Sequence, residues 1–434
     1  MQLEKHNKTP NLKALLTTAT CALLGSATNS ASAQDNWELD TALMYYGESD
    51  RVTAIEAIIA GQKTYDNDEV LSLKLTLDSL TGASANGAVA QPQAQTFTRP
   101  SGNGSYTENA GKTPLDDTFK DTRLQLTGQW TQPLTYAEFE DYTLSIGGNV
   151  SKEYDYLSVS INGNLARDLN NKNTTLSAGL AYSFDKIEPE GGIPKPLATM
   201  VIGDNDSETF EQAFEQTRIR ADDDKKTLDL LLGLTQVINR RMIVQLNYSY
   251  SSVDGYTTDP FKVISVVDSE GYTQRYLYEN RPNERVKHAF FGQAKYHFES
   301  TILDASYRFM TDDWEIDSHT IDLRYYIPLS RGHYIEPHVR YYTQSAAEFY
   351  QPFLIQGQVT PTYVSADYRI GDMNAYTLGI KYGMPLNSGD RLAFRVEYYK
   401  QSPKSNGTNA IGVLNDVELY EEINAVIAQI TYSF

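Results

Sequence analysis

The chain has 434 residues, of which 37 are Lys or Arg and 56 are Asp or Glu, so its formal net charge is −19. A mean hydropathy of −0.46 and the lack of a long apolar run beyond residue 30 exclude a polytopic helical membrane protein. Aromatic residues make up 11% of the chain, including 31 Tyr, which excludes intrinsic disorder. The acidic balance argues against a nucleic-acid partner, because phosphate binding requires clustered Lys and Arg.

The N-terminus has the organisation of a secretory signal peptide. A basic segment over residues 1–13 precedes an apolar stretch over residues 14–28, and Ala31-Ser32-Ala33 forms a small-x-small cleavage pattern. We therefore predict that residues 1–33 are removed on export, which leaves residues 34–434 as a single domain. The only Cys, Cys21, lies in the removed segment, so we expect neither disulfides nor thiolate metal sites. A lipid anchor on Cys21 is the alternative.

From residue 36 onward, apolar and polar residues alternate with a period of two. Residues 71–78, for example, place four leucines on one face and Ser, Lys, Thr and Asp on the other. Such alternation is typical of β-strands that have one apolar face. The pattern predicts strands over residues 36–46, 51–62, 69–79, 120–131, 141–150, 156–166, 174–184, 226–238, 241–252, 286–298, 301–310, 319–327, 334–343, 373–383, 391–400 and 423–434.

Two all-β architectures fit this alternation. In a soluble sandwich the apolar faces pack inward and strands average about 5–6 residues. In a transmembrane barrel the apolar faces meet lipid, and a strand needs about 9–11 residues to cross the bilayer. The predicted strands are of the longer kind, and their charged residues gather on the faces opposite the apolar ones. We therefore predict a transmembrane, antiparallel, up-and-down β-barrel.

The connection lengths predict the topology of this barrel. The long connections are residues 80–119, 185–225, 253–285, 344–372 and 401–422. Outer-membrane barrels have long external loops and short periplasmic turns, so we assign all five connections to the outside. Both termini then lie on the periplasmic side, which agrees with sixteen strands, although fourteen to eighteen remain possible. An apolar alternation over residues 363–370 would break this parity, so we place it in an external loop.

The last residues form a pattern of their own. Phe434 is aromatic, and Tyr432, Ile430, Ala428 and Val426 precede it at alternate positions. This pattern resembles the assembly signal of Gram-negative outer-membrane barrels. It implies a location in the outer membrane, contact with its lipid and lipopolysaccharide, and recognition of the C-terminal strand by the barrel-assembly machinery. A periplasmic partner is left open.

Tyrosine is expected to concentrate where strands meet lipid head groups, because its ring is apolar and its hydroxyl is polar. The residues expected there are Tyr142, Tyr182, Tyr248, Tyr296, Tyr325, Tyr334, Tyr341, Tyr382 and Tyr432.

The predicted lumen face carries a series of charges: Asp304, Arg308, Asp322, Arg324, Glu336, His338, Arg340, Arg395 and Glu397. Acids and bases alternate over 304–308, 322–324 and 336–340 on three neighbouring strands, so we expect them to contact one another across strands. One interpretation is a transverse field that orients a polar solute in a pore. The other is a narrow or plugged lumen held together by charge pairs. We favour the second, because mixed signs in contact neutralise the field.

The densest polar segment is residues 312–319, which contains Asp312, Asp313, Asp317 and His319. Asp and His near a barrel rim are similar to the pair that activates water in omptin-type outer-membrane proteases. Strand parity, however, places His319 on the same outer face as Ile321. The interpretation we favour is a tight external hairpin, with Trp314 at the membrane interface and Asp side chains that cap turn amides. We therefore expect no enzyme activity.

Acidic residues also cluster in one external loop: Asp204, Asp206, Glu208, Glu211, Glu215 and Asp222 to Asp224. Carboxylates at short spacing suit Ca²⁺ or Mg²⁺. We favour a solvated acidic loop and assign neither a metal nor a cofactor.

Several segments resemble the bacterial domain-of-unknown-function family numbered 3570. They are DSLTGASANGA (78–88), SKEYDYLS (151–158), NNKNTTLSAGLAYSFD (170–185), GYTTDPFKVISVVD (255–268), YENRPNER (278–285), SYRFMTDDWEIDSHT (306–320) and SADYR (365–369). The resemblance implies an outer-membrane β-barrel and no catalytic residue. Because several of these segments fall in predicted external loops, we expect an ordered cap in which Arg281 and Arg285 pair with carboxylates.

These observations lead to three functional hypotheses. The leading one is an outer-membrane barrel that serves as a pore or docking scaffold through its charged lumen and ordered external loops. The second is a sealed barrel that displays its loops to a partner. The third is an omptin-like hydrolase that uses residues of 312–319.

Overall fold

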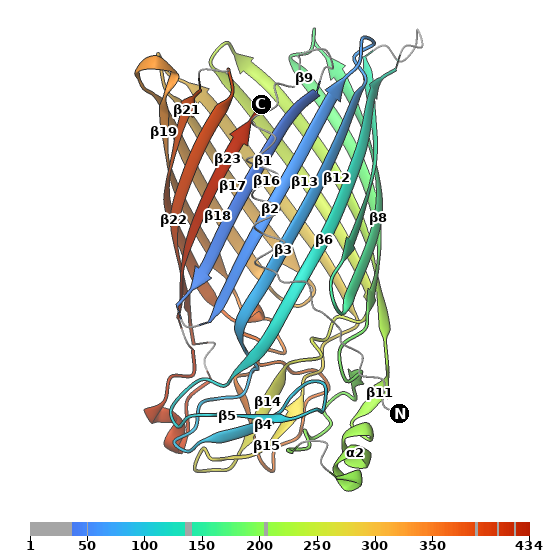
Figure 1. The fold of residues 1–434 in the computed structure, drawn as a ribbon, viewed down its shortest axis with the longest axis vertical. Coiled ribbons are helices and arrows are strands. Elements are labelled where there is room, and N and C mark those ends of the chain that lie inside the picture. Colours follow the sequence, from blue (N-terminus) through green and yellow to red (C-terminus); the bar gives the residue numbers. More distant parts are fainter. Residues whose placement is uncertain are drawn as a thin grey trace, which may run out of the picture.

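The structure is a computed structural model that describes residues 37–49, 51–134, 141–203, 207–386, 389–405, 408–420 and 422–434. The predicted signal peptide and Cys21 lie outside these residues, as do Asp204 and Asp206 of the acidic loop. In the described part, sixteen strands pair antiparallel and close into one barrel (Figure 1). The barrel strands are β1 (Trp37–Glu48), β2 (Val52–Thr64), β3 (Val70–Ala85), β6 (Leu115–Pro133), β7 (Tyr142–Lys152), β8 (Tyr156–Leu169), β9 (Thr174–Ile187), β12 (Asp223–Asn239), β13 (Met242–Gly255), β16 (Glu284–His297), β17 (Ile302–Asp312), β18 (Asp317–Pro328), β19 (Tyr334–Gln344), β21 (Met373–Pro385), β22 (Arg391–Pro403) and β23 (Ile423–Ser433).

The predicted strand count and topology are confirmed. Each predicted strand corresponds to one barrel strand, and consecutive barrel strands are neighbours around the wall. β23 pairs with β1 and closes the circle, with Tyr432 opposite Thr41. Closure leaves no unpaired sheet edge, as a backbone surrounded by lipid requires. The 363–370 segment is not a barrel strand; it ends in the 3₁₀ helix η3 (Tyr368–Ile370) outside the wall.

The two faces of the wall have the polarity predicted for a membrane barrel. Leu126, Ile146 and Ile161 point outward, with 55%, 58% and 66% of their surface exposed. Polar residues such as Thr76 and Asp78 occupy the alternate, lumen-facing positions. An apolar belt of this extent would be unfavourable in water and matches the hydrocarbon of a bilayer. Within the part of the chain that the structure describes, no helix is both long and apolar enough to cross a membrane.

One tyrosine expected at the head groups lies on the other face. Tyr334 has the same parity on β19 as His338 and lies over Gly383, its neighbour on β21. Its ring is 4.9 Å from that of Tyr326, so the two rings fill space inside the wall.

All five long connections gather at one end of the barrel, opposite the C-terminus (Figure 1). The described parts of residues 86–114, 188–222, 256–283, 345–372 and 404–422 form a folded unit, which we call the cap. Its elements are β4 (Gln95–Thr98), β5 (Ser105–Glu108), β10 (Ile193–Pro194), α2 (Glu208–Glu215), β11 (Arg218–Arg220), β14 (Val263–Val267), β15 (Thr273–Tyr278), β20 (Phe353–Ile355), η3 and η4 (Gly412–Asp416). A further 3₁₀ turn, η2 (Ser330–Gly332), lies between β18 and β19 at the opposite end.

The cap has a hydrophobic core of its own. β14 is buried at all five positions and forms a three-stranded sheet with β15 and β20. Four of its five residues are apolar and the fifth is Ser265, a composition typical of a strand covered on both faces. Val89, Val267, Phe353 and Leu414, from four different connections, pack together in one cluster. The cap is therefore a packed unit, as the expectation of an ordered cap requires.

Candidate functional site

The cap contains a network of six charged side chains, of which Lys262, Glu279, Arg281 and Asp367 are buried and Asp259 and Arg369 are partly exposed. Arg281 Nε lies 2.6 Å from Glu279 Oε1, and Arg281 Nη2 donates to Asp367 Oδ2 at 2.7 Å. Arg369 Nε donates to Asp367 at 2.9 Å, and its Nη2 donates to Asp259. Three acids and three bases balance, which is the arrangement that makes buried charge tolerable.

Burial and pairing have opposite effects on the carboxyl groups of this network. Burial alone would raise the pKa of Asp367, but the charge of Arg369 and its hydrogen bonds hold that pKa well below its usual range. For Glu279 burial prevails, and its pKa is raised although Arg281 opposes the shift. Burial likewise lowers the pKa of Lys262, whose ammonium donates to the backbone carbonyl of Ala85. The network thus ties two cap connections to each other and to the end of β3.

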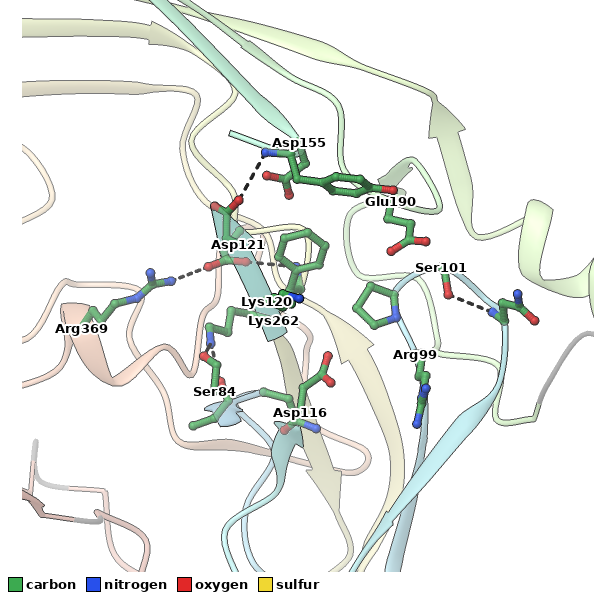
Figure 2. A pocket seen from close by; sticks show the side chains of 17 residues that line it. Ser84, Arg99, Ser101, Asp116, Lys120, Asp121, Asp155, Glu190, Lys262 and Arg369 are labelled. Atoms are coloured by element: carbon green, nitrogen blue, oxygen red, sulfur yellow. Dashed lines mark hydrogen bonds and ion pairs between the residues drawn. The ribbon is translucent and has the colours of Figure 1, made fainter. Parts of the chain in front are cut away.

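Beside this network the cap contains a cavity of about 400 Å³ (Figure 2). Lys262 and Arg369 reach it from the network, whereas Asp121 and Asp155 line another side. The carboxylates of Asp121, Glu153 and Asp155 lie within 4.8 Å of one another. Burial and the nearby Asp121 raise the pKa of Glu153 to about 7. A bound cation or a shared proton would relieve this crowding.

A second cavity, of about 500 Å³, lies where the lumen meets the cap, and we call it the lumen chamber. Tyr46, Tyr342 and Tyr399 line it from barrel strands, and Tyr368 lines it from the cap. Each barrel tyrosine donates its hydroxyl to the side chain two residues further along its own strand, at 2.6–2.9 Å. The acceptors are Glu48, Gln344 and Gln401. The chamber therefore combines aromatic faces with fixed polar groups, as ligand pockets commonly do.

Asp322, His338 and Glu397 form a hydrogen-bonded chain, which we call the relay, along the lumen wall from β18 to β22. His338 and Glu397 also line the lumen chamber. His338 on β19 lies 2.9 Å from Asp322 on β18 through Nε2, and 2.9 Å from Glu397 on β22 through Nδ1. Donating to both carboxylates requires both ring nitrogens to carry a proton. β21 separates β19 from β22, and its Gly379 is the neighbour of both His338 and Glu397. A Cβ on Gly379 would lie 2.5 Å from Glu397 Cγ, so only glycine lets Glu397 cross β21.

The remaining predicted lumen residues also face inward, but their partners differ from those expected. Asp304 accepts from Gln293 at 2.6 Å and pairs with Lys295 at 3.2 Å on the neighbouring β16. Within the described chain no ion pair joins Asp304 to Arg308, because the two side chains are four residues apart on one extended strand. The other contacts are Arg324 Nε to Asp322 at 3.3 Å and Arg395 Nε to Glu397 at 3.8 Å. Glu336 lies opposite Lys381. Arg308, Arg324 and Arg340 line a third cavity, of about 250 Å³.

Of the polar residues expected in the external loops, Arg285, Asp312 and Asp313 lie together at the 312–317 hairpin. Arg285 donates to Asp312 through Nε and Nη2, and its guanidinium lies 4.3 Å from the Trp314 ring centre. Asp312 also accepts from the amides of Trp314 and Ile316, and Asp313 accepts from the amide of Val286. These contacts are the turn capping that the hairpin interpretation predicts. The expectation for Trp314 is wrong: it is 4% exposed and packs against Phe349 inside the cap.

His319, Asp317 and Arg281 lie apart from this hairpin core. His319 is on the outer face, as parity predicts, and its Nδ1 is 2.7 Å from the hydroxyl of Tyr307. Asp317 is exposed at the start of β18, where its amide donates to Ser345. Arg281 belongs to the cap network, where its carboxylate partners are Glu279 and Asp367. No site that combines these three side chains is therefore present in the described residues.

The C-terminal residues lie at the seam of the barrel. Tyr432 donates its hydroxyl to Asp390 at 2.6 Å, and the amide of Phe434 donates to Leu39 at 2.9 Å. The two aromatic rings are 4.5 Å apart and perpendicular.

The sequence interpretation missed one lumen cluster and most of the cap network. Arg123 on β6 lies 2.5 Å from Asp78 on β3 and 3.7 Å from Glu56 on β2. Opposite charges at lumen positions of neighbouring strands are a signal that could have identified it. The loop partners Glu279, Asp367 and Arg369 carry no such periodic signal.

The fold and site together define an all-β protein with a closed sixteen-strand barrel that has an apolar exterior, a charged lumen and a folded cap. The chain belongs to the family described as Protein of unknown function (DUF3570), whose model matches residues 13–434. A search of curated proteins finds no match.

Solved structures with similar folds include a bacterial polysaccharide outer membrane secretin, at a TM-score of 0.44 and 9% identity over 93% of this chain and 100% of that one. The siderophore receptor PirA from Acinetobacter baumannii aligns with a TM-score of 0.41 and 10% identity over 87% of this chain. A mutant of the ferric enterobactin receptor from Pseudomonas aeruginosa aligns with a TM-score of 0.45 and 9% identity over 92% of this chain. The present chain spans 57% and 60% of these two receptors.

Proposed function

We propose that this protein is an outer-membrane β-barrel that admits a small polar solute to its charged lumen beneath an external cap. One observation carries the proposal: residues of the cap and of the barrel wall line the same chamber of about 500 Å³. Tyr368 and Arg369 come from the cap, and His338 and Arg340 come from β19. Sixteen-strand barrels are wide enough to leave an aqueous channel. The cap would then control access to that channel from outside the cell.

The proposal includes a location in the outer membrane with the cap on the external side. The apolar outer face suits lipid, and the large cap suits the external side, where outer-membrane barrels have their longer loops. Lipopolysaccharide would surround the cap end of the wall. Tyr432 and Phe434 at the seam would present the C-terminal strand to the barrel-assembly machinery. Separation of the inner and outer membranes of producing cells tests the location: the full chain should fractionate with the outer membrane. The same fractionation with Phe434 deleted tests the role of the C-terminal strand, and the deletion should lower the amount of protein in the outer membrane.

Single-channel recording tests the proposed passage. Protein purified in detergent and inserted into planar bilayers should give discrete conductance steps. The variant Arg281→Met, which removes the central cation of the cap network, should open more often or more widely if the cap closes the mouth. A closed barrel would give no steps with either protein, although both migrate as folded barrels in unheated gel samples. That result would reject passage through the lumen.

A sealed interaction barrel is the second candidate, and the cap itself favours it. Phe97, Ile264, Val364 and Leu414 are fully buried in the cap, so the loops form a surface rigid enough to present to a partner. The lumen charges would then hold the wall together. Silence of wild type and Arg281→Met in bilayers would support this candidate.

We further propose that residues 312–319 have a structural role and that the protein is not a hydrolase. Arg285 and the turn amides already engage Asp312, and His319 faces outward beside Tyr307. An Asp–His pair must share one water to activate it, which these positions do not allow. Peptidase or esterase activity of wild type that is lost in Asp317→Asn and His319→Ala would contradict this proposal.

A further inference from the structure

We propose that the lumen wall formed by β17, β18 and β19 binds an oxyanion, a phosphate or carboxylate group of the solute, through Arg308, Arg324 and Arg340. The inference rests on the proposed function in one respect, since it names the chemical class of the solute that enters the lumen.

The strand register places the three arginines around one space. β18 pairs with both β17 and β19, so Asp304, Arg324 and His338 form one row across the three strands. Arg340 belongs to the next row, opposite Asp322, and Arg308 belongs to the row beyond that one. Arg324 and Arg340 are therefore diagonal to one another on neighbouring strands, a separation of about 7–8 Å that arginine side chains can span. All three arginines line the same cavity of about 250 Å³.

In the described part of the chain, the two carboxylates that line the cavity form ion pairs with neither Arg308 nor Arg340. Asp304 is held by Gln293 and by Lys295 from β16. Asp322 accepts His338 at one oxygen, and its other oxygen pairs with Arg324 at 3.3 Å. Three guanidinium groups and two carboxylates line the cavity, and Lys295 adds a further positive charge at its edge. Although the whole chain has a net charge of −19, this part of the wall is positive.

Arg308 and Arg340 are the two arginines of this cavity that are free to bind an anion. Both side chains are exposed, and the described residues provide neither of them with an ion-pair partner. A guanidinium presents several N–H donors in a planar fork, which fits the oxygens of phosphate or carboxylate. Arg340 also lines the lumen chamber below the cap, so it connects the chamber to the arginine cavity. A solute in the lumen chamber would therefore lie beside Arg340.

Binding of inorganic phosphate and of citrate to the full chain in detergent tests the inference at low ionic strength. Isothermal titration compares the wild type with the double variant Arg308→Gln/Arg340→Gln. Arg331→Gln is the matched control, because Arg331 is exposed at the turn between β18 and β19, outside the cavity. We expect binding of at least one of the two anions, weakened at least tenfold in the double variant and unchanged in the control. Binding of phosphate alone would assign a phosphoryl group, and binding of citrate a carboxylate.

Two results would overturn the inference: no binding of either anion to the folded wild type, or equal binding by wild type and double variant. Electrophoresis of unheated samples shows whether each variant is folded, and substitution at these exposed positions leaves the packing of the wall intact. Titration in detergent does not need a conducting pore, because binding requires access to the lumen from one end only. A silent barrel that binds phosphate would therefore reject passage and keep the anion site. A conducting barrel that binds neither anion would support passage and reject the anion site.

Discussion

Replacing Gly379 by alanine should break the contact that carries Glu397 across β21 to His338. An ideal Cβ on Gly379 lies 2.5 Å from Glu397 Cγ, whereas carbon atoms in contact are about 3.5–4.0 Å apart. Glu397 must therefore retreat by about 1 Å. Its distance of 2.9 Å from His338 then exceeds hydrogen-bond range.

The energetic effect follows from the burial of this pair. The two side chains are only 10% and 9% exposed, so water compensates little for the lost contact. A hydrogen bond to a charged group contributes about 1.5–3 kcal/mol. Replacing glycine by alanine within a strand stabilises the folded state by roughly 0.5–1 kcal/mol, because alanine loses less backbone entropy on folding. We therefore expect Gly379→Ala to destabilise the barrel by about 1–2 kcal/mol.

A double-mutant cycle with Glu397→Ala separates this contact from a general effect of alanine. Urea unfolding from lipid vesicles, followed by tryptophan fluorescence, measures each free energy. With the glutamate shortened, Gly379→Ala should be neutral or slightly stabilising, so the coupling energy should be about 2 kcal/mol. Gly163→Ala is the control, because the nearest atom to its added Cβ is 3.9 Å away. An equal cost of Gly379→Ala with and without Glu397 would refute the relay.

Three further predictions concern the cap and the adjoining loops. Arg281→Met should destabilise the cap by about 3–5 kcal/mol, because it leaves Glu279 and Asp367 buried without their shared partner; limited proteolysis should then cut within residues 255–285, which intact wild type should resist. The folded state favours protonated Glu153, whose pKa is raised to about 7 from an unfolded value near 4.5. Stability of the turn at residues 153–155 should therefore fall as pH rises through this window, and Glu153→Gln should abolish the pH dependence of the protection factors of the turn amides in hydrogen exchange. Asp312→Ala removes the acceptor of two turn amides and the partner of Arg285, and should cost roughly 2–4 kcal/mol in the same urea assay; an effect below 0.5 kcal/mol would contradict the proposed structural role.

The barrel could be predicted from the sequence because its signal is local. Alternation over residues 71–78 places four leucines on one face of a strand whatever its neighbours are, and lipid rather than a second sheet must cover that face when strands are this long. Loop lengths then order the strands, because an up-and-down barrel joins each strand to the next. For the same reason parity placed His319 outside and the charges of β17 to β19 inside.

The partners of those charges could not be predicted, because they depend on groups that are distant along the chain. Glu397 reaches His338 across an intervening strand, which requires a glycine whose role appears only when three strands are aligned in register. Trp314 is of a residue type that often lies at the membrane interface, but here the cap covers it. Residues of the 345–372 connection pack against its ring. The sequence alone thus determined the barrel, its parity and its polarity, which follow from neighbours two residues apart. Only the tertiary structure decided which charges are neutralised and which arginines remain exposed to the lumen, because electrostatic pairing depends on distance in space.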